Sequence, residues 1–348
     1  MSKRLLWGMI VVLLCAVPLR AQDTAQADKG YQEALRRIEE ARVSGAIELD
    51  LSSLALTILP PEIGQLTNLQ SLGLSNNQLT TLPREVGGLV SLIWLNVSEN
   101  LVSIVPAEIG QLSNLRELDL SSNRLTSLPP EIGHLISLRK LDLSANSFTT
   151  FPLAITHMSG LQILYLTNNL LLMIPAEIAQ MTNLRELSLY GNQLTDLPPE
   201  IGQLANLEGF HVGGNQLMSL PPEIGQLVHL VVLGISNNQL TSLPPEIGRL
   251  TNLQWLDLRD NHLSNLPLEM GHLSQLTDLK ISSVPFPLPL EILQQGTAAT
   301  LGYLRDYEAM QMRQTIAAIA AGVGGIVGLI LAFRWRQRRG LSEKKKRL

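Results

Sequence analysis

The sequence predicts an α/β solenoid, with a parallel sheet along one face of a stack of short turns. Three observations carry this prediction. An asparagine recurs nine times at intervals of 23 residues, without insertion or deletion. Hydrophobic residues, mostly leucines, alternate with polar residues or glycine just before the asparagines, which is typical of a short strand. A stretch close to L-P-P-E-I-G-Q-L completes most copies. A fixed period of this length indicates stacked repeats that share one core.

The asparagine column is the most regular feature of the chain. Its members are Asn77, Asn100, Asn123, Asn146, Asn169, Asn192, Asn215, Asn238 and Asn261. Leu54 and Val284 hold the same phase one copy earlier and later, so residues 46–289 contain about 11 turns. Buried backbone N–H and C=O groups need partners, and an amide offers both donors and an acceptor. We therefore expect these side chains to point inward and bridge successive turns.

Each repeat divides into a strand and a short helical turn. Leu118 and Leu120 flank the polar Asp119, so the strand buries one face and exposes the other. In the second half, proline fixes φ and glutamate follows near the start of a short helix or 3-10 turn. Aliphatic residues dominate a composition that is 45% hydrophobic but only 4% aromatic. This composition suits identical turns packed on one another.

The repeat resembles a known family. Leu115, Leu118, Leu120, Asn123 and Leu125 give L-x-x-L-x-L-x-x-N-x-L, followed by L-P. This pattern resembles the 23-residue leucine-rich repeat with L-P-x-x-I-G-x-L in its second half. Roughly residues 28–308 resemble the repeat domain of bacterial Roco proteins and of Ras-group leucine-rich repeat proteins. The sequence contains no G-x-x-x-x-G-K-[ST] phosphate loop, so no GTPase or kinase module is expected. The resemblance implies partner binding on a concave sheet.

The first 21 residues predict a secretory signal peptide. Lys3 and Arg4 precede an apolar run, and Ala21 is a small residue suited to cleavage. Lipidation at Cys15 and retention as an uncleaved anchor are the alternatives. Cys15 is the single cysteine, so a processed chain would have no disulfide and no cysteine-based metal site.

Capping helices are expected at both ends of the solenoid. In residues 22–45, Ala34, Ile38 and Ala41 recur at helical spacing and would cover the first turn. A helix lying on a membrane surface is the alternative. Residues 290–314 predict a C-terminal cap that continues into a juxtamembrane helix.

Residues 315–333 predict a transmembrane helix, and residues 334–348 a basic cytoplasmic tail. The uncharged run is long enough to cross a bilayer, and the tail carries eight Arg or Lys against one Glu. With the leader, this predicts a single-pass type I protein whose repeats are extracytoplasmic. A small-residue face of Ala321, Gly324, Gly325 and Gly328 would let two spans form a homodimer. Glycine is common in membrane spans, so a passive anchor is the alternative.

Charge narrows the class of partner. The chain has 26 Lys and Arg residues, of which three precede Ala21 and eight follow Phe333. The segment from Ala21 to Phe333 therefore has 15 basic residues, against 29 acidic ones. A net charge of about −14 on this segment would repel nucleic-acid phosphates, so no nucleic-acid partner is expected. The basic tail suits contact with anionic lipid.

Candidate ligand-binding residues lie on the exposed side of the predicted sheet. Aromatic side chains bury a large rigid area and still make a polar contact, which favours them at interfaces. The candidates are Trp94, Asn96, Tyr165, Tyr190, His211 and Trp255. The alternative is a ladder of side chains that stack on one another without a partner.

Catalysis has little support in the sequence. Asp119 and Asp142 stand one repeat apart and could form a carboxylate pair, but an open sheet excludes little water. We expect no enzyme activity, no cofactor and no metal. The predicted function is recognition of a protein or surface polymer by a membrane-anchored repeat domain. The alternatives are a structural or adhesive envelope spacer, and a cytoplasmic scaffold for a small GTPase if the leader is misread.

Overall fold

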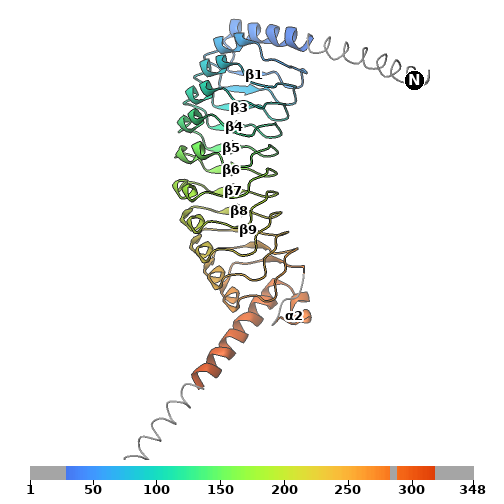
Figure 1. Cartoon of the computed structure of the whole chain (residues 1–348), viewed down its shortest axis with the longest axis vertical. Coiled ribbons are helices and arrows are strands. Elements are labelled where there is room, and N and C mark those ends of the chain that lie inside the picture. Colours follow the sequence, from blue (N-terminus) through green and yellow to red (C-terminus); the bar gives the residue numbers. More distant parts are fainter. Residues whose placement is uncertain (1–28, 283–287, 318–348) are drawn as a thin grey trace, which may run out of the picture.

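The protein is a solenoid of eleven parallel strands, each hydrogen-bonded to the next in chain order. The computed structural model describes residues 29–282 and 288–317. Figure 1 shows the strands stacked from one end of the molecule to the other. The strands are β1 (Glu48–Asp50), β2 (Ser71–Gly73), β3 (Trp94–Asn96), β4 (Glu117–Asp119), β5 (Lys140–Asp142), β6 (Ile163–Tyr165), β7 (Glu186–Ser188), β8 (Gly209–His211), β9 (Val232–Gly234), β10 (Trp255–Asp257) and β11 (Asp278–Lys280).

The register of the sheet repeats the 23-residue period. Leu118 pairs with Leu141, and Asp119 pairs with Asp142. The central residue of each strand from β2 to β10 is buried, as in Leu118 and Leu141. The first and third residues therefore point outward, and we call this outward side the sheet face. The leucine-rich repeat solenoid expected from the sequence is confirmed.

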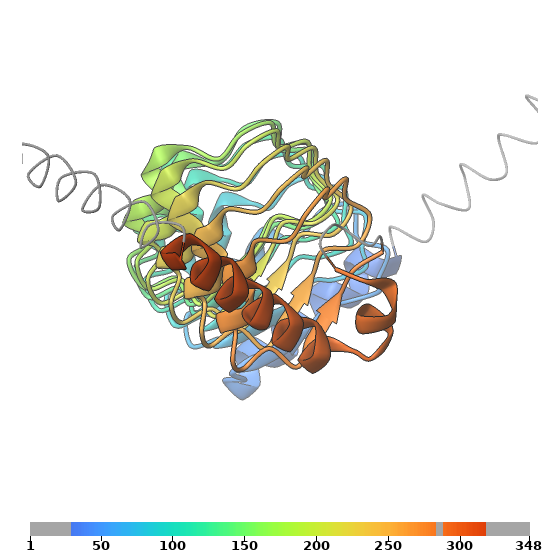
Figure 2. The same cartoon turned by 90° about the horizontal axis from the view of Figure 1, so that it is seen from below.

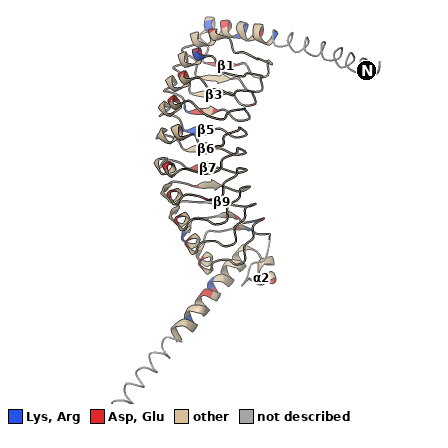
Figure 3. Cartoon of the chain, in the orientation of Figure 1, with Lys and Arg blue, Asp and Glu red and all other residues tan. Residues whose placement is uncertain are grey.

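A 3-10 helix follows each of the first ten strands. These are η1 (Pro61–Gln65), η2 (Arg84–Gly88), η3 (Ala107–Gln111), η4 (Pro130–His134), η5 (Leu153–His157), η6 (Ala176–Gln180), η7 (Pro199–Gln203), η8 (Pro222–Gln226), η9 (Pro245–Arg249) and η10 (Leu268–His272). Proline precedes every one, which suits a residue that fixes φ and donates no hydrogen bond. Figure 3 shows acidic residues recurring along these helices, because glutamate is the second residue in all but η5.

The 3-10 helices stack in close contact. In η3, a Cβ added to Gly110 would lie 2.4 Å from the carbonyl oxygen of Glu131 in the next repeat. A glycine stands at this fourth position in most of the helices, whereas Thr156 and Ala179 stand there in η5 and η6. The missing side chain therefore sets how near successive turns can approach.

Each asparagine of the column joins two repeats. The Oδ1 atom of Asn123 accepts a hydrogen bond from the Val102 amide at 2.9 Å. Its Nδ2 donates to the carbonyl oxygens of Val97 at 2.9 Å and Leu120 at 3.1 Å. The same pattern recurs from Asn77 to Asn261. Within the described residues, no buried side-chain nitrogen or oxygen lacks a partner.

Helices close both ends of the stack. The N-terminal helix, residues 29–44, buries Ala34, Ile38 and Ala41 against the first repeat. At the other end, α2 (Leu290–Gln294) precedes a helix over residues 297–317. Figure 2 shows this second helix lying across the open end of the last repeat. There it buries Leu304. Arg305 lies against Gly271, at the position that the next repeat occupies beside the equivalent glycines of other turns. The two capping helices expected from the sequence are present.

Several expectations concern residues outside the described part of the chain. They are the leader with Cys15, most of the span 315–333 with its face of Ala321, Gly324, Gly325 and Gly328, and the basic tail. Among the helices that the structure does describe, none combines the length and apolar character needed to cross a membrane.

Candidate functional site

The sheet face carries a hollow at its centre, over strands β6 to β9. It has a volume of about 470 Å³. Its lining residues are Gln162, Ile163, Arg185, Glu186, Glu208, Gly209, His211, Val231 and Val232. We call it the Gly209 hollow, because the first residue of β8 has no side chain while its neighbours in adjacent strands are Glu186 and Val232.

Two glycines shape this region. A Cβ added to Gly209 would meet only the Cγ atom of Glu186, at 3.4 Å, so the space above it is open. Gly234 lies between His211 and Trp255, whose ring centroids are 6.3 Å apart and tilted by 52°. A Cβ on Gly234 would lie 3.0 Å from Nδ1 of His211. The two aromatic rings therefore approach each other across an intervening strand that has no side chain there.

Tyr165, on β6, contacts Glu186, one of the residues that line the Gly209 hollow. Its hydroxyl donates a hydrogen bond to Oε1 of Glu186 at 2.9 Å. The Nζ atom of Lys140 lies 5.7 Å from the centroid of the Tyr165 ring, which is a cation–π contact. Burial, together with the Glu186 carboxylate, raises the pKa of Tyr165 to about 12. The phenol therefore stays protonated and keeps Glu186 in place beside the hollow.

A second, more polar hollow adjoins the first at the edge of the sheet. It has a volume of about 460 Å³ and shares Arg185, Glu208 and Val231 with the Gly209 hollow. Arg185 and Glu208 form an ion pair that is about half exposed. Together the two hollows have apolar walls, the Glu208 carboxylate that is paired with Arg185, and amide side chains such as Asn252 and Gln254. This chemistry suits a ligand with both apolar and polar groups.

The structure brings some of the sequence candidates together and separates others. Tyr165, His211 and Trp255 border one continuous surface from β6 to β10. Trp94 lies on β3, beyond the charged strands β4 and β5. Asn96, also on β3, accepts hydrogen bonds at Oδ1 from the backbone and hydroxyl of Ser98, at 2.8 and 2.7 Å. The Oδ1 atom of Asn96 therefore already accepts two hydrogen bonds within a turn.

Tyr190 lies just past the end of β7, with 44% of its surface exposed. A Cβ added to Gly213 would lie 3.1 Å from its ring, so Tyr190 rests on the backbone of the next repeat. Sequence reasoning did not single out Arg185, Glu208 or Gly209. The signal that could have found Gly209 is a glycine in a strand column that otherwise carries larger side chains.

The two carboxylates on β4 and β5, Asp119 and Asp142, accept hydrogen bonds from backbone amides. Oδ1 of Asp119 accepts from the Ser121 amide, and Oδ1 of Asp142 accepts from the Ser144 amide, each at 2.9 Å. Burial and the nearby charge of Asp119 raise the pKa of Asp142. Within residues 29–282 and 288–317, no group of three or more His, Cys, Asp or Glu side chains could hold a metal ion.

The fold and this surface define a class of protein, the repeat solenoids that present an open sheet to a partner. Comparison with family profiles agrees with this architecture. The profile described as leucine-rich repeat region matches residues 48–122, 103–194 and 223–298, and a two-copy leucine-rich repeat profile matches residues 182–222. The chain belongs to the leucine-rich repeat proteins, a family of usually non-enzymatic binding proteins.

Solved structures show the same relationship. A leucine-rich repeat protein of Leptospira interrogans is 40% identical, with 66% of this chain and 70% of that chain covered and a TM-score of 0.54. The plant peptide hormone receptor RGFR1 in complex with RGF2 is 29% identical, covering 65% and 42%, with a TM-score of 0.53. The Toll–Spatzle complex of Drosophila is 25% identical, covering 71% and 35%, with a TM-score of 0.64. This chain thus spans less than half of the matched chain in each of these two complexes. A comparison with curated proteins finds no match.

Proposed function

We propose that this protein recognises a protein ligand through its sheet face, and that the Gly209 hollow receives a ligand side chain. The continuous surface from Tyr165 to Trp255 carries this proposal. Interfaces concentrate their binding energy in buried aromatic anchors that surround or fill a pocket. Two similar structures are complexes with a peptide hormone and with Spatzle, which supports a protein as the ligand class.

Filling the Gly209 hollow should abolish binding without damaging the fold. Gly209→Phe places a ring in open space, and phenylalanine is favoured in strands. With the full chain as bait in a cell extract, we expect at least one protein whose recovery falls at least tenfold with Gly209→Phe. The same protein should be lost with Trp255→Ala, because Trp255 borders the same surface.

Ser71→Phe is the matched control, because Ser71 holds the same column position on β2, far from the hollow. It should leave recovery of that protein unchanged. A structural or adhesive spacer predicts equal recovery of every protein with all three variants, and that result would overturn the proposal. A surface polymer as ligand would instead appear as loss of carbohydrate binding with an unchanged set of proteins.

The proposal includes membrane anchoring with the repeats outside the cytoplasm. It rests on the sequence of residues 1–21 and 315–348, which lie almost wholly outside the described structure. A single-cysteine experiment tests it in a Cys15→Ser background, because Cys15 is the only native cysteine. In cells with a permeable outer envelope and an intact inner membrane, Thr251→Cys should react with a membrane-impermeant maleimide, and Ser342→Cys should react only after lysis.

The reverse labelling pattern, or labelling of both sites only after lysis, would contradict this topology. It would favour the cytoplasmic scaffold for a small GTPase. Dimerisation through Ala321, Gly324, Gly325 and Gly328 remains part of the proposal. It predicts that Gly324→Ile with Gly328→Ile lowers self-association of the span in a membrane two-hybrid assay.

A further inference from the structure

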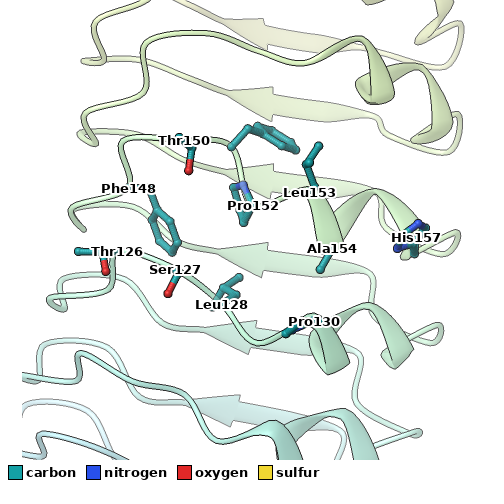
Figure 4. A pocket seen from close by; sticks show the side chains of 11 residues that line it. Thr126, Ser127, Leu128, Pro130, Phe148, Thr150, Pro152, Leu153, Ala154 and His157 are labelled. Atoms are coloured by element: carbon teal, nitrogen blue, oxygen red, sulfur yellow. The ribbon is translucent and has the colours of Figure 1, made fainter.

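Another recessed surface, apart from the two hollows, lies away from the sheet face, between two successive repeats. Figure 4 shows this groove, which runs between residues 126–130 of one repeat and residues 148–157 of the next. Its volume is about 470 Å³, within the size range of ligand pockets. The walls are mainly apolar and include Leu128, Phe148 and Phe151, with three hydroxyl side chains and His157 completing the lining.

The groove exists because one repeat departs from the others at several positions together. Phe148 and Phe151 replace the aliphatic residues found at their positions elsewhere in the solenoid. Pro152 has a ψ of 88°, whereas the other prolines before 3-10 helices have values from 131° to 158°. Leu128 is left partly exposed, although its equivalents in the other repeats are at most 6% exposed. An apolar floor is thus open to solvent at this one repeat.

Charge is also removed at the groove and kept on both sides of it. Ala154 lines the groove and stands where every other 3-10 helix has glutamate. Glu131 in η4 and Glu177 in η6 hold that position in the two neighbouring turns. The stacking of η4 on η5 is close, since a Cβ added to Gly133 would lie 2.7 Å from the Ala154 carbonyl oxygen. The groove lining itself thus carries no carboxylate, and glutamates flank Ala154 one turn before and one turn after it.

Apolar side chains continue from the groove onto the next repeat. Leu170, Leu172 and Met173 are 42%, 56% and 64% exposed. Leu172 and Met173 stand one repeat after Thr149 and Thr150, so they occupy the neighbouring turn of the stack. Neighbouring turns are about 5 Å apart, and an extended peptide places alternate side chains roughly 7 Å apart. A peptide segment along the stack could therefore contact both repeats.

We propose that this groove is a second protein-docking site, for a segment with apolar anchor side chains flanked by basic residues. The apolar floor receives the anchors, and Glu131 and Glu177 attract the flanking charges. This site lies between the asparagine turn and the 3-10 helix, so it is separate from the Gly209 hollow. It can be occupied independently of the ligand on the sheet face.

The experiment uses the full chain in phosphatidylcholine nanodiscs and fluorescein-labelled synthetic peptides. The probe is Lys-Arg-Phe-Ser-Leu-Arg-Lys, and the comparison peptides replace the basic residues with Glu or the apolar residues with Ser. Fluorescence anisotropy should show the probe binding at least tenfold more tightly than either comparison peptide. Ala154→Gln should weaken probe binding at least tenfold, because it extends into the groove a side chain as long as the glutamate of the other turns.

Ala205→Gln is the matched control, an exposed alanine outside the groove, and it should leave the affinity unchanged. The double variant Glu131→Gln with Glu177→Gln should weaken the probe roughly threefold or more and reduce its salt dependence. Equal binding of the three peptides, or wild-type affinity in Ala154→Gln, would overturn the proposal. The proposal would also be overturned if the chain self-associates and Ala154→Gln abolishes that self-association, because the occupant of the groove would then be a second copy of the chain. Gly209→Phe should leave probe binding intact, which separates this site from the one on the sheet face.

Discussion

Replacing Asn123 with alanine should lower the free energy of unfolding by about 3 kcal/mol. The substitution removes the acceptor for the Val102 amide and the donors for the Val97 and Leu120 carbonyl oxygens. These groups are buried between two repeats, and each one left without a partner costs about 1–3 kcal/mol, partly offset by relaxation. Urea denaturation followed by circular dichroism measures the change. Because repeats are stabilised through their nearest neighbours, the loss falls on the interfaces that Asn123 joins.

Asn114→Ala is the matched control for this prediction. Asn114 also donates from Nδ2 to a carbonyl oxygen of the preceding repeat, that of Val90 at 2.9 Å, but it is exposed and water can replace the bond. We expect a change within about 0.5 kcal/mol. Similar losses in the two variants would mean that the buried bridge adds nothing beyond an ordinary surface hydrogen bond.

The repeating architecture could be predicted from the sequence because the period has no interruption. A 23-residue spacing from Asn77 to Asn261 places every strand in the same register as its neighbours. The hydrogen-bonding capacity of an amide then indicates what the column does. The alternation around Asp119 likewise predicts which side chains face outward, and the strand from Glu117 to Asp119 has that pattern.

The backbone conformation before each asparagine could not be predicted in the same way. The preceding residue has positive φ in every repeat from Asn76 to Asp260. Gly191 and Gly214 are glycines and four other positions are Asn or Asp, which tolerate positive φ, but the three remaining positions, Glu99, Ser122 and Ala145, give no such signal. The strand end must turn sharply to bring the asparagine inward, and tertiary packing imposes this conformation on residues such as Ala145, whose φ is 52°.

The candidate site could likewise be predicted from the sequence only in part. The exposed aromatic residues were visible in the sequence, since Tyr165 and Trp255 stand at outward positions of a predicted strand. The hollow between them was not, because it depends on side chains that are absent at Gly209 and Gly234. The apolar groove was visible in the sequence only in part. Phe148, Phe151 and Ala154 depart from the repeat pattern, but the ψ angle of Pro152 and the exposure of Leu128 cannot be read from it.

A pair of glycine-to-alanine substitutions should show that glycine has two different roles in this solenoid. In η8, a Cβ on Gly225 would lie 2.4 Å from the Glu246 carbonyl oxygen and 2.7 Å from the Glu246 Cβ. The next repeat would have to move away, and overpacking of this kind costs about 1–3 kcal/mol. We expect Gly225→Ala to lower the free energy of unfolding by about 2 kcal/mol, measured by urea denaturation.

Gly209→Ala should have the opposite effect, because its added Cβ meets nothing closer than the Glu186 Cγ at 3.4 Å. Alanine restricts the unfolded chain, so stability should be unchanged or rise by up to about 1 kcal/mol. Thr156 and Ala179 show that a side chain at the fourth position of a 3-10 helix is compatible with the fold when the neighbouring turn adjusts. Equal effects of the two substitutions would therefore mean that the turns move apart at no cost, and that glycine does not set the spacing of the stack.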